Sequence, residues 1–313
     1  MGKPVVYIDG KEGTTGLQIY DRLAGREDIE LLLIDEDKRK DAAERKKLLN
    51  AADLVFLCLP DAAAAEAVEL VENPHTRIID ASTAHRTAPG WVYGFPELGA
   101  DQREAIRTAK RVANPGCYAT GFIALAAPLV KAGLLPPGAP LTCHAVSGYT
   151  GGGKKSIAQY EAEEREAELV SPRHYAVTLS HKHIPEMMQI SGLTRKPIFM
   201  PMICDFPQGM VVTVPVYLDM LSGRQSLASL GALYCDFYAG SRFVTVRPDG
   251  APCGFIGSNN LAGTNDLQIF VCGNEEQAML VSRLDNLGKG ASGAAVQNMN
   301  IMLGFPEEAG LVK

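Results

Sequence analysis

PVVYIDGKEGTTG, residues 4–16, is the stretch of this chain that decides its fold. A short run rich in β-branched residues ends at Asp9, glycines follow at every third position, and the next apolar residues recur at helical spacing. Glycine permits a tight turn and lets the backbone approach a pyrophosphate, and the free N–H groups at a helix start attract that anion. Threonine hydroxyls at such a turn add donors and can cap the helix. The stretch therefore predicts a strand, a phosphate-binding turn and a helix, with the turn formed by Gly10, Gly13, Thr14, Thr15 and Gly16.

The alternation of strand and helix continues to residue 80. Buried strands are predicted at 30–34, 52–60 and 76–80, and helices at 38–50 and 62–71. Continuous apolar strands separated by helices indicate a parallel, doubly wound sheet that is covered on both faces. We therefore expect an α/β fold with a Rossmann-type parallel sheet in a nucleotide-binding domain at 1–116.

Beyond residue 117 the pattern changes. A helix is predicted at 120–132, with a bend at Pro128. Longer strands at 209–217, 242–246 and 266–272 alternate apolar and polar residues, which is typical of an antiparallel or mixed sheet. The chain therefore contains a second, α+β domain, and it ends in a predicted helix at 292–303 whose small residues favour close packing.

The composition argues against several classes of partner. The 313 residues carry 30 Lys and Arg against 36 Asp and Glu, and the net charge of −6 disfavours nucleic acid or an anionic membrane. No apolar run approaches the roughly 20 residues of a membrane span, and the N-terminus shows no apolar signal segment. The seven cysteines include no CxxC pair, which disfavours a zinc site and fits a reducing compartment. We expect a cytoplasmic protein with no metal, in which cysteines such as Cys58 are small buried hydrophobes.

The end of the second predicted strand bears on the choice of cofactor. Asp35 suits a ribose 2′-hydroxyl, as in NAD enzymes, whereas Lys38 and Arg39, followed by Lys40, suit the 2′-phosphate of NADP. Three clustered cations favour NADP, although they also fit a solvated helix start. Ser82, after the fourth strand, is expected to line the edge of the cofactor.

ANPGCYAT, residues 113–120, contains the candidate nucleophile. Cys117 follows a Pro-Gly turn and precedes a predicted helix. A helix N-terminus lowers the pKa of a thiol and so increases the fraction of reactive thiolate. The turn is therefore suited to hold a nucleophilic sulfur at the mouth between two domains.

SHKHIPE, residues 180–186, supplies candidates for a general acid or base. If the segment is extended, His181 and His183 project from one face. Glu186 can then orient an imidazole, as the third member of a catalytic triad does. The alternative is that these are ordinary polar residues exposed to solvent. A metal pair is disfavoured because no nearby cysteine or carboxylate lies at the spacing of a metal ligand. The residues alone do not distinguish the two histidines.

SGYTGGGKK, residues 147–155, is a glycine-rich turn with two lysines. Gly148, Gly153 and Lys154 match part of a Walker A motif, but Lys155 stands where that motif needs Ser or Thr for magnesium. The backbone is suited to reach a nicotinamide or a substrate phosphate, and the lysines are suited to hold phosphate charge. A plain surface turn is the alternative interpretation.

These blocks, followed by DNLGKGASGAAVQNMNIMLG at 285–304, resemble the N-acetyl-γ-glutamyl-phosphate reductases, in particular their short-form, type 2 subfamily. The resemblance runs from residue 5 to about 305. It implies a fold similar to aspartate-semialdehyde and glyceraldehyde-3-phosphate dehydrogenases, in which 285–313 complete an NADP-binding domain at 1–116 and 117–284 form the catalytic and dimerisation domain. It also implies NADPH-dependent reduction of N-acetyl-γ-glutamyl phosphate to N-acetylglutamate 5-semialdehyde and phosphate in arginine biosynthesis, through a cysteine thioester, by a homodimer or homotetramer.

The motifs and the resemblance together give a set of expected site residues. The catalytic group is Cys117, His181, His183 and Glu186. The expected cofactor contacts are Gly10, Gly13, Thr14, Thr15, Gly16, Lys38, Arg39, Pro60, Ser82, Gly148 and Asn286. The expected substrate contacts are Asn114, Ser147, Tyr149, Lys154 and Lys155.

Three other functions fit parts of this pattern. A reductase of aspartyl phosphate or of a carrier-linked aminoadipyl phosphate would share the cofactor and the nucleophile. A nucleotide-sensing binding protein would keep the glycine turn but would not need Cys117 together with the histidine block. A cysteine hydrolase would act without NADPH, and the N-terminal glycine turn disfavours it.

Overall fold

The structure is a computed structural model that describes residues 2–251 and 254–313. The chain divides into two compact units. The first unit comprises the chain up to Pro96, Ala100–Pro115 and Ala291–Leu311. The second unit comprises Glu97–Gly99, Gly116–Gly290 and Val312–Lys313.

The first unit contains a parallel six-stranded sheet in the part of the chain that the structure describes. Its strand order is β2-β1-β3-β4-β6-β5, and each neighbouring pair is parallel. The strands are β1 (Val5–Asp9), β2 (Glu30–Leu32), β3 (Leu54–Leu57), β4 (Arg77–Asp80), β5 (Val92–Tyr93) and β6 (Arg111–Ala113). The helices are α1 (Thr14–Leu23), α2 (Ala42–Ala51), α3 (Asp61–Glu69), α4 (Ala100–Thr108) and α9 (Gly293–Leu303), with the short turn η1 (Glu36–Lys38). A further short turn, η2 (Pro96–Leu98), begins in this unit, but its residues Glu97 and Leu98 belong to the second unit.

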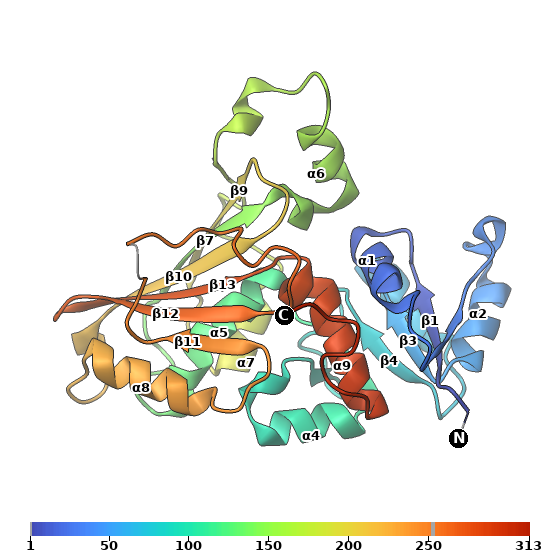
Figure 1. The fold of residues 1–313 in the computed structure, drawn as a ribbon, viewed down its shortest axis with the longest axis horizontal. Helices are drawn as coiled ribbons and strands as arrows, with labels where there is room; N and C mark the ends of the chain where they lie inside the picture. Colours follow the sequence, from blue (N-terminus) through green and yellow to red (C-terminus); the bar gives the residue numbers. More distant parts are fainter. Residues whose placement is uncertain (1, 252–253) are drawn as a thin grey trace. The chain divides into compact units, whose positions relative to one another are not determined.

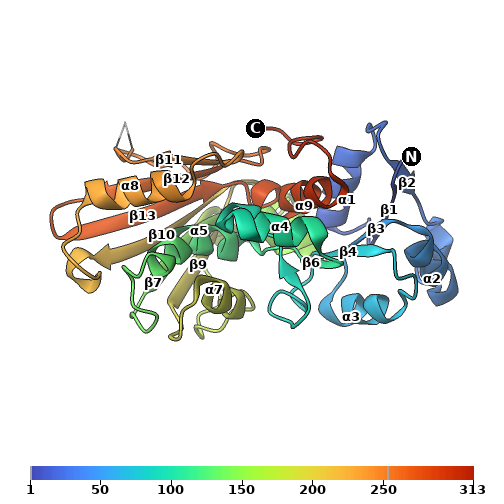
Figure 2. The ribbon, with the colours of Figure 1, turned by 90° about the horizontal axis from the view of Figure 1, so that it is seen from below.

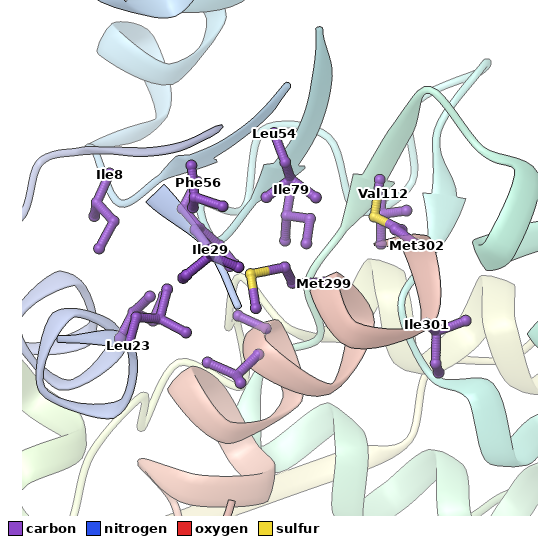
Figure 3. Close-up of a cluster of buried hydrophobic side chains, with 14 of the residues drawn as sticks. Ile8, Leu23, Ile29, Leu54, Phe56, Ile79, Val112, Met299, Ile301 and Met302 are labelled. Atoms are coloured by element: carbon purple, nitrogen blue, oxygen red, sulfur yellow. The ribbon is translucent and has the colours of Figure 1, made fainter. Parts of the chain in front are cut away.

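Helices cover both faces of this sheet, as continuous apolar strands require. Figure 2 shows α2 and α3 on one side of β1, β3 and β4, and α1 and α9 on the other. The C-terminal helix α9 contributes Val296, Met299 and Met302 to the same buried cluster as Phe56 and Ile79 of the central strands (Figure 3). The end of the chain is therefore part of the core built by its beginning.

The second unit contains a mixed seven-stranded sheet among the described residues. Its order is β11-β12-β13-β10-β7-β9-β8, in which β11–β12 and β7–β9 are parallel and the other pairs are antiparallel. The strands are β7 (Thr142–Gly148), β8 (Arg173–His174), β9 (Ile198–Cys204), β10 (Met210–Tyr217), β11 (Val244–Arg247), β12 (Leu267–Gly273) and β13 (Gln277–Leu284). The helices are α5 (Cys117–Lys131), α6 (Gly153–Tyr160), α7 (Ile184–Ser191) and α8 (Leu227–Phe237), with turns η3 (Tyr149–Gly152), η4 (Ala167–Val170), η5 (Leu218–Met220) and η6 (Gly288–Ser292). Figure 1 shows α5 and α8 beside the strands β10 to β13.

Helix α5 runs unbroken through Pro128. Proline has no N–H, so the carbonyl of Ala124 loses the donor that a regular helix would supply four residues later. The buried hydroxyl of Tyr238 replaces that donor and hydrogen-bonds to the Ala124 oxygen at 2.8 Å. Burial raises the pKa of Tyr238, which keeps this hydroxyl protonated. The neighbouring Tyr234 donates to the Leu125 oxygen at 2.6 Å.

The α/β class, with a parallel sheet followed by a mixed sheet, is confirmed, but several local predictions were wrong. Strand β2 ends at Leu32, so Asp35 lies in a turn beyond it. The helix predicted from residue 38 starts at Ala42, because the carboxylate of Asp41 caps it by accepting the Ala43 and Glu44 N–H groups. The helix predicted from residue 120 starts at Cys117.

Residues 181–183 are not extended, so the condition under which His181 and His183 would project from one face is not met. His183 has helical backbone angles and is the N-cap of α7. The two histidines therefore do not project from one face of a strand, because Ile184, Pro185 and the residues after them form a helix.

No helix among residues 2–251 and 254–313 is both long and apolar enough to cross a membrane. The six described cysteines are free thiols. Cys143 and Cys204 are buried, and Cys235 is exposed. The prediction that Cys58 is buried was wrong, because this residue is only partly covered. The seventh, Cys253, lies outside the described residues.

Candidate active site

The glycine turn of the first unit lies between β1 and α1. The carbonyl of Gly10 accepts a hydrogen bond from the Gly13 N–H at 3.0 Å, and a side chain at Gly16 would collide with that same carbonyl oxygen. Gly10 itself has φ +87°, a conformation that favours glycine. The predicted capping by threonine was wrong, because the N-cap of α1 is Gly13. The Thr14 hydroxyl is instead buried without a hydrogen-bond partner among the described residues.

An ion pair at the end of β1 was not found from the sequence. Arg45 of α2 hydrogen-bonds to both carboxylate oxygens of Asp9, at 2.8 Å for the closest pair, and both side chains are largely buried. The charge of Asp9, one residue before the glycine turn, would repel a phosphate. The guanidinium of Arg45 offsets that charge, and α2 places it there from 36 residues away in the sequence.

The basic residues expected to select NADP lie in exposed, local ion pairs. Lys38 Nζ contacts the Asp35 carboxylate at 2.9 Å, and Arg39 contacts Glu36 at 3.9 Å. The hydrogen bond to Asp35 raises the pKa of Lys38. Side chains this exposed remain able to exchange one anionic partner for another, because surface ion pairs are weak.

The carboxyl ends of β3 and β4 carry the other expected cofactor contacts of the first unit. Pro60 is the N-cap of α3. The hydroxyl of Ser82 donates to the buried carboxylate of Asp80 at 2.6 Å, and the Ser82 N–H donates to the same group. Asp80 also contacts His85 Nδ1 at 2.6 Å. Ser82 therefore shapes the turn after β4 with a hydroxyl that Asp80 already engages.

Asn114 is buried within the first unit. Its amide nitrogen donates to the carbonyl of Ala291 at 2.9 Å, and its amide oxygen accepts from Asn298 of α9 at 3.3 Å. Asn298 also donates to the carbonyl of Gly94 at 2.9 Å. Asn114, expected to contact the substrate, thus uses its side chain to fix the backbone that leads to the Pro-Gly turn.

Cys117 is the first residue of α5, in the second unit, and it is partly exposed. Gly116 precedes it as the N-cap and has no side chain to satisfy the first N–H groups of the helix. The N–H groups and the helix dipole at this end of a helix stabilise negative charge, whether on a thiolate or on a developing oxyanion. The sequence thus placed the sulfur correctly at a helix start.

Glu186 of α7 is tied to the turn that carries the thiol. Its Oε2 accepts a hydrogen bond from the Gly116 N–H at 3.1 Å, and its Oε1 lies 4.0 Å from His183 Nε2. Both side chains are buried, Glu186 to 1% and His183 to 5% exposure. The His183 N–H donates to His181 Nδ1 at 3.1 Å. The structure therefore brings together four expected catalytic residues in one unit, with Glu186 between the nucleophile's turn and an imidazole.

Two tyrosines complete this cluster. The ring of Tyr118 lies 5.9 Å from the rings of both His181 and His183 and 6.2 Å from that of Tyr175, while the Tyr175 hydroxyl is 3.5 Å from His181 Nε2. Burial raises the pKa of both tyrosines, and the charge of nearby Cys117 adds to each increase. Both hydroxyls therefore stay protonated at neutral pH. Tyr118 adjoins Cys117 in the sequence, but nothing in the sequence marked Tyr175.

The glycine-rich block at 147–155 spans the end of β7, η3 and the start of α6. Ser147 is 2% exposed and donates to the Gly148 carbonyl at 3.1 Å. Tyr149 stacks on Tyr160 with ring centroids 4.7 Å apart and donates to Glu161, so its ring belongs to a small core. Lys154 and Lys155 are exposed on the first turn of α6, where a phosphate can reach them.

Asn286 joins two of these segments. Its side-chain oxygen accepts from the Gly209 N–H at 2.8 Å, and its nitrogen donates to Thr150 Oγ1 at 3.0 Å. The side chain is 1% exposed. Asn286 therefore connects η3 to the residue before β10, and one amide hydrogen remains for a further acceptor.

Comparisons with known proteins agree over most of the chain. Residues 34–109 match the family "Semialdehyde dehydrogenase, NAD binding domain", and residues 117–286 match "Semialdehyde dehydrogenase, dimerisation domain". This chain is also similar to proteins named N-acetyl-gamma-glutamyl-phosphate reductase. One of these, from Sinorhizobium fredii, is 53% identical over 96% of this chain and 99% of the Sinorhizobium chain. One named N-acetyl-gamma-glutamyl-phosphate reductase 2, from Nostoc sp., is 51% identical over 99% of this chain and 100% of its own.

A solved structure shares the fold at much lower identity. Aspartate semialdehyde dehydrogenase II from Vibrio cholerae, complexed with ASA, matches with a TM-score of 0.74 and 14% identity, over 97% of this chain and 99% of the other. The same architecture is therefore shared by chains whose sequences have diverged widely.

Proposed function

The chain belongs to the N-acetyl-gamma-glutamyl-phosphate reductase family, and from that premise we propose that Cys117 is the nucleophile with which it reduces an acyl phosphate to an aldehyde. The enzyme is an NADP-dependent oxidoreductase of arginine biosynthesis. Its substrate is N-acetyl-γ-glutamyl phosphate, and its products are N-acetylglutamate 5-semialdehyde and phosphate. The observation that carries the assignment of the nucleophile is the buried Glu186, which contacts both the turn before Cys117 and His183.

The first unit fits a dinucleotide. Gly10 and Gly16 keep the turn free of side chains, the N-terminal N–H groups of α1 are uncapped by a side chain, and the buried Thr14 hydroxyl lacks a partner among the described residues. These groups would hold the pyrophosphate. Lys38 and Arg39 would hold the 2′-phosphate by exchanging their surface partners for it. When bound, NADPH supplies the hydride.

The covalent steps belong to Cys117. Its Sγ attacks the γ-carbonyl carbon, the bond to phosphate breaks, and a thioester remains, which divides one difficult reduction into two easier steps. The N–H groups at the start of α5 stabilise the negative charge on the carbonyl oxygen. After reduction, the C–S bond breaks, the aldehyde leaves and the thiolate is restored. Lys154 and Lys155 hold the phosphoryl group before it departs.

His183 is the general acid and base in this proposal. It is buried, and the carboxylate of Glu186, three residues later, lies 4.0 Å from its Nε2. His183 donates a proton to the carbonyl oxygen as the tetrahedral species forms and removes it as the aldehyde leaves. His181 accepts the His183 N–H and contacts Tyr175, so it positions the start of α7.

The protein forms a homo-oligomer, because residues 117–286 belong to a dimerisation-domain family. We propose a homodimer that pairs through the open face of the seven-stranded sheet. Tyr217, Met279 and Ile198 are exposed there to 56%, 42% and 51%, although they are large and apolar. The free cysteines fit a reducing compartment, and we propose the cytoplasm.

Reverse turnover tests the function. NADP⁺ reduction would be followed with N-acetylglutamate semialdehyde and phosphate, with aspartate semialdehyde as the control substrate. NADPH formation that requires phosphate, prefers the acetylated aldehyde and disappears in Cys117→Ala is the expected result. Turnover of aspartate semialdehyde alone would overturn the substrate, and full activity in Cys117→Ala would overturn the nucleophile.

A further inference from the structure

The segment Asp285–Gly290 lies directly against the nucleophile. A methyl group added at Gly290 would be 2.7 Å from Cys117 Cβ, closer than a Cβ atom approaches in proteins. It would also be tightly placed at 3.1 Å from Cys117 Cα and 3.0 Å from the Asp285 carbonyl oxygen. The backbone of Gly290 lies outside the left-handed region, so its conformation does not itself demand glycine. Its N–H donates to the Asp285 carbonyl at 2.9 Å, which closes the segment into a tight turn. The absence of a side chain at 290 therefore serves the contact with Cys117.

Other residues of the same turn are fixed by side-chain contacts. The Asp285 carboxylate is fully buried and accepts the Leu287 N–H at 2.8 Å and the Gly263 N–H. Asn286 holds Gly209 and Thr150, as described above. These contacts fix Asp285 and Asn286, which form the first half of the turn. In the second half, the residue beside Gly290 makes the side-chain contact.

Lys289 is that residue, and it forms a buried ion pair. Its Nζ contacts Glu97 Oε1 at 2.6 Å, and each of the two side chains is 1% exposed. The partners are 192 residues apart in the sequence. Lys289 Nζ also lies 5.7 Å from the centre of the Phe243 ring. A cation this deep in a protein is held in one place by its partner.

Stability alone does not account for such a pair. Removing two charges from water is costly, and replacing a buried ion pair with apolar residues is often neutral or stabilising. The pair does supply a short, charge-assisted and directional contact next to the residue that touches Cys117. The region η6 is also π-helical from Gly288 to Ser292, a distortion that occurs often at functional sites.

We propose that Lys289 is a positioning residue: its ion pair with Glu97 holds Gly290 against Cys117 and so fixes the thiol at the N-terminus of α5. The inference deepens the proposed function, since it concerns the sulfur to which that function assigns the chemistry. A turn that moved away would let the Cys117 side chain change rotamer and leave the N–H groups that stabilise its thiolate.

The test measures the reactivity of one thiol in the full-length protein. Iodoacetamide alkylation of Cys117 is followed by peptide mass spectrometry from pH 5 to 10, with the exposed Cys235 as an internal reference on the same chain. Gly290→Ala adds the methyl group that meets Cys117. The double variant K289M/E97Q removes both charges, so that no unpaired charge is left buried. Gly138→Ala is the matched control, because its nearest neighbour would be 3.8 Å away.

Both test variants are expected to shift the pH midpoint of Cys117 alkylation upward by about one unit and to lower kcat about tenfold, with alkylation of Cys235 and NADPH binding unchanged. Gly138→Ala should match the wild type. A folded Gly290→Ala and a folded K289M/E97Q that both keep the wild-type midpoint and kcat would overturn the proposal. If K289M/E97Q has a lower Tm but an unchanged alkylation midpoint and kcat, the ion pair stabilises the fold and does not position Cys117, which would also overturn the proposal. If the wild type lacks reductase activity, the alkylation result still decides the positioning, and only the proposed function fails.

Discussion

Glu186 accepts a hydrogen bond from the backbone N–H of Gly116 at 3.1 Å, one residue before Cys117. The same carboxylate lies 4.0 Å from His183 Nε2. A single buried side chain thus relates the backbone of the nucleophile's turn to the candidate acid and base. The carboxylate of Glu186 therefore has two separable roles. The hydrogen bond from Gly116 needs only an acceptor oxygen, whereas the interaction with the His183 imidazole depends on the negative charge of the carboxylate.

Glu186→Gln and Glu186→Ala should therefore differ. The amide oxygen of glutamine still accepts the Gly116 N–H, so E186Q should unfold like the wild type and lose kcat through the missing charge. E186A should in addition lose about 1–3 kcal/mol of stability, because a buried N–H is left unsatisfied. Urea unfolding and steady-state kinetics measure both effects. Equal stability of the two variants would show that the hydrogen bond contributes little.

Substitutions of His183 and His181 should change the dependence of kcat on pH in different ways. His183→Asn should lower kcat by about 10²–10⁴-fold and remove one limb of the pH–rate profile. His181→Asn should keep that limb and lose less, because an asparagine oxygen can still accept the His183 N–H. Profiles of kcat against pH for both variants, beside the wild type, decide this. If only H181N loses this limb of the pH–rate profile, His181 and not His183 is the general acid and base.

Tyr238 and Pro128 should be coupled energetically. Tyr238→Phe should cost about 1–3 kcal/mol, because the buried Ala124 carbonyl then lacks a donor. In a Pro128→Ala background the restored N–H supplies that donor, so the same change should cost clearly less. Urea denaturation of the four proteins in this cycle measures the coupling. Tyr234→Phe is the control, since the Leu125 carbonyl keeps its helical partner.

His144 should make the protein less stable in mild acid. Burial, and then the charge of His174, lower the pKa of His144 below its ordinary 6.5. The unfolded chain therefore takes up a proton below about pH 6.5 that the folded chain refuses, and stability falls until the pH reaches the lowered folded pKa. His144→Gln should reduce the drop in Tm between pH 7.5 and 5.5. An unchanged drop would mean that other groups cause it.

Several features could be predicted from local sequence because they depend on local physics. Continuous apolar runs separated by helical segments indicated the parallel sheet, and glycines after the first strand indicated the turn before α1. The Pro-Gly pair indicated a helix start at the candidate nucleophile, although the helix begins three residues earlier than predicted. The start of α2 was predicted wrongly because a cap decides it, and the side-chain contacts of Asp41 give no periodic signal.

The sequence by itself determined the alternation of strands and helices over the first 80 residues and the position of Cys117 close to the start of a helix, because each of these depends on residues within a few positions of one another. Only the tertiary structure decided which side chains meet that turn. Glu186 reaches Gly116 across 70 residues and Lys289 reaches Glu97 across 192. Such pairs form because packing of whole elements brings distant residues to one place, and no local pattern records which residues these are.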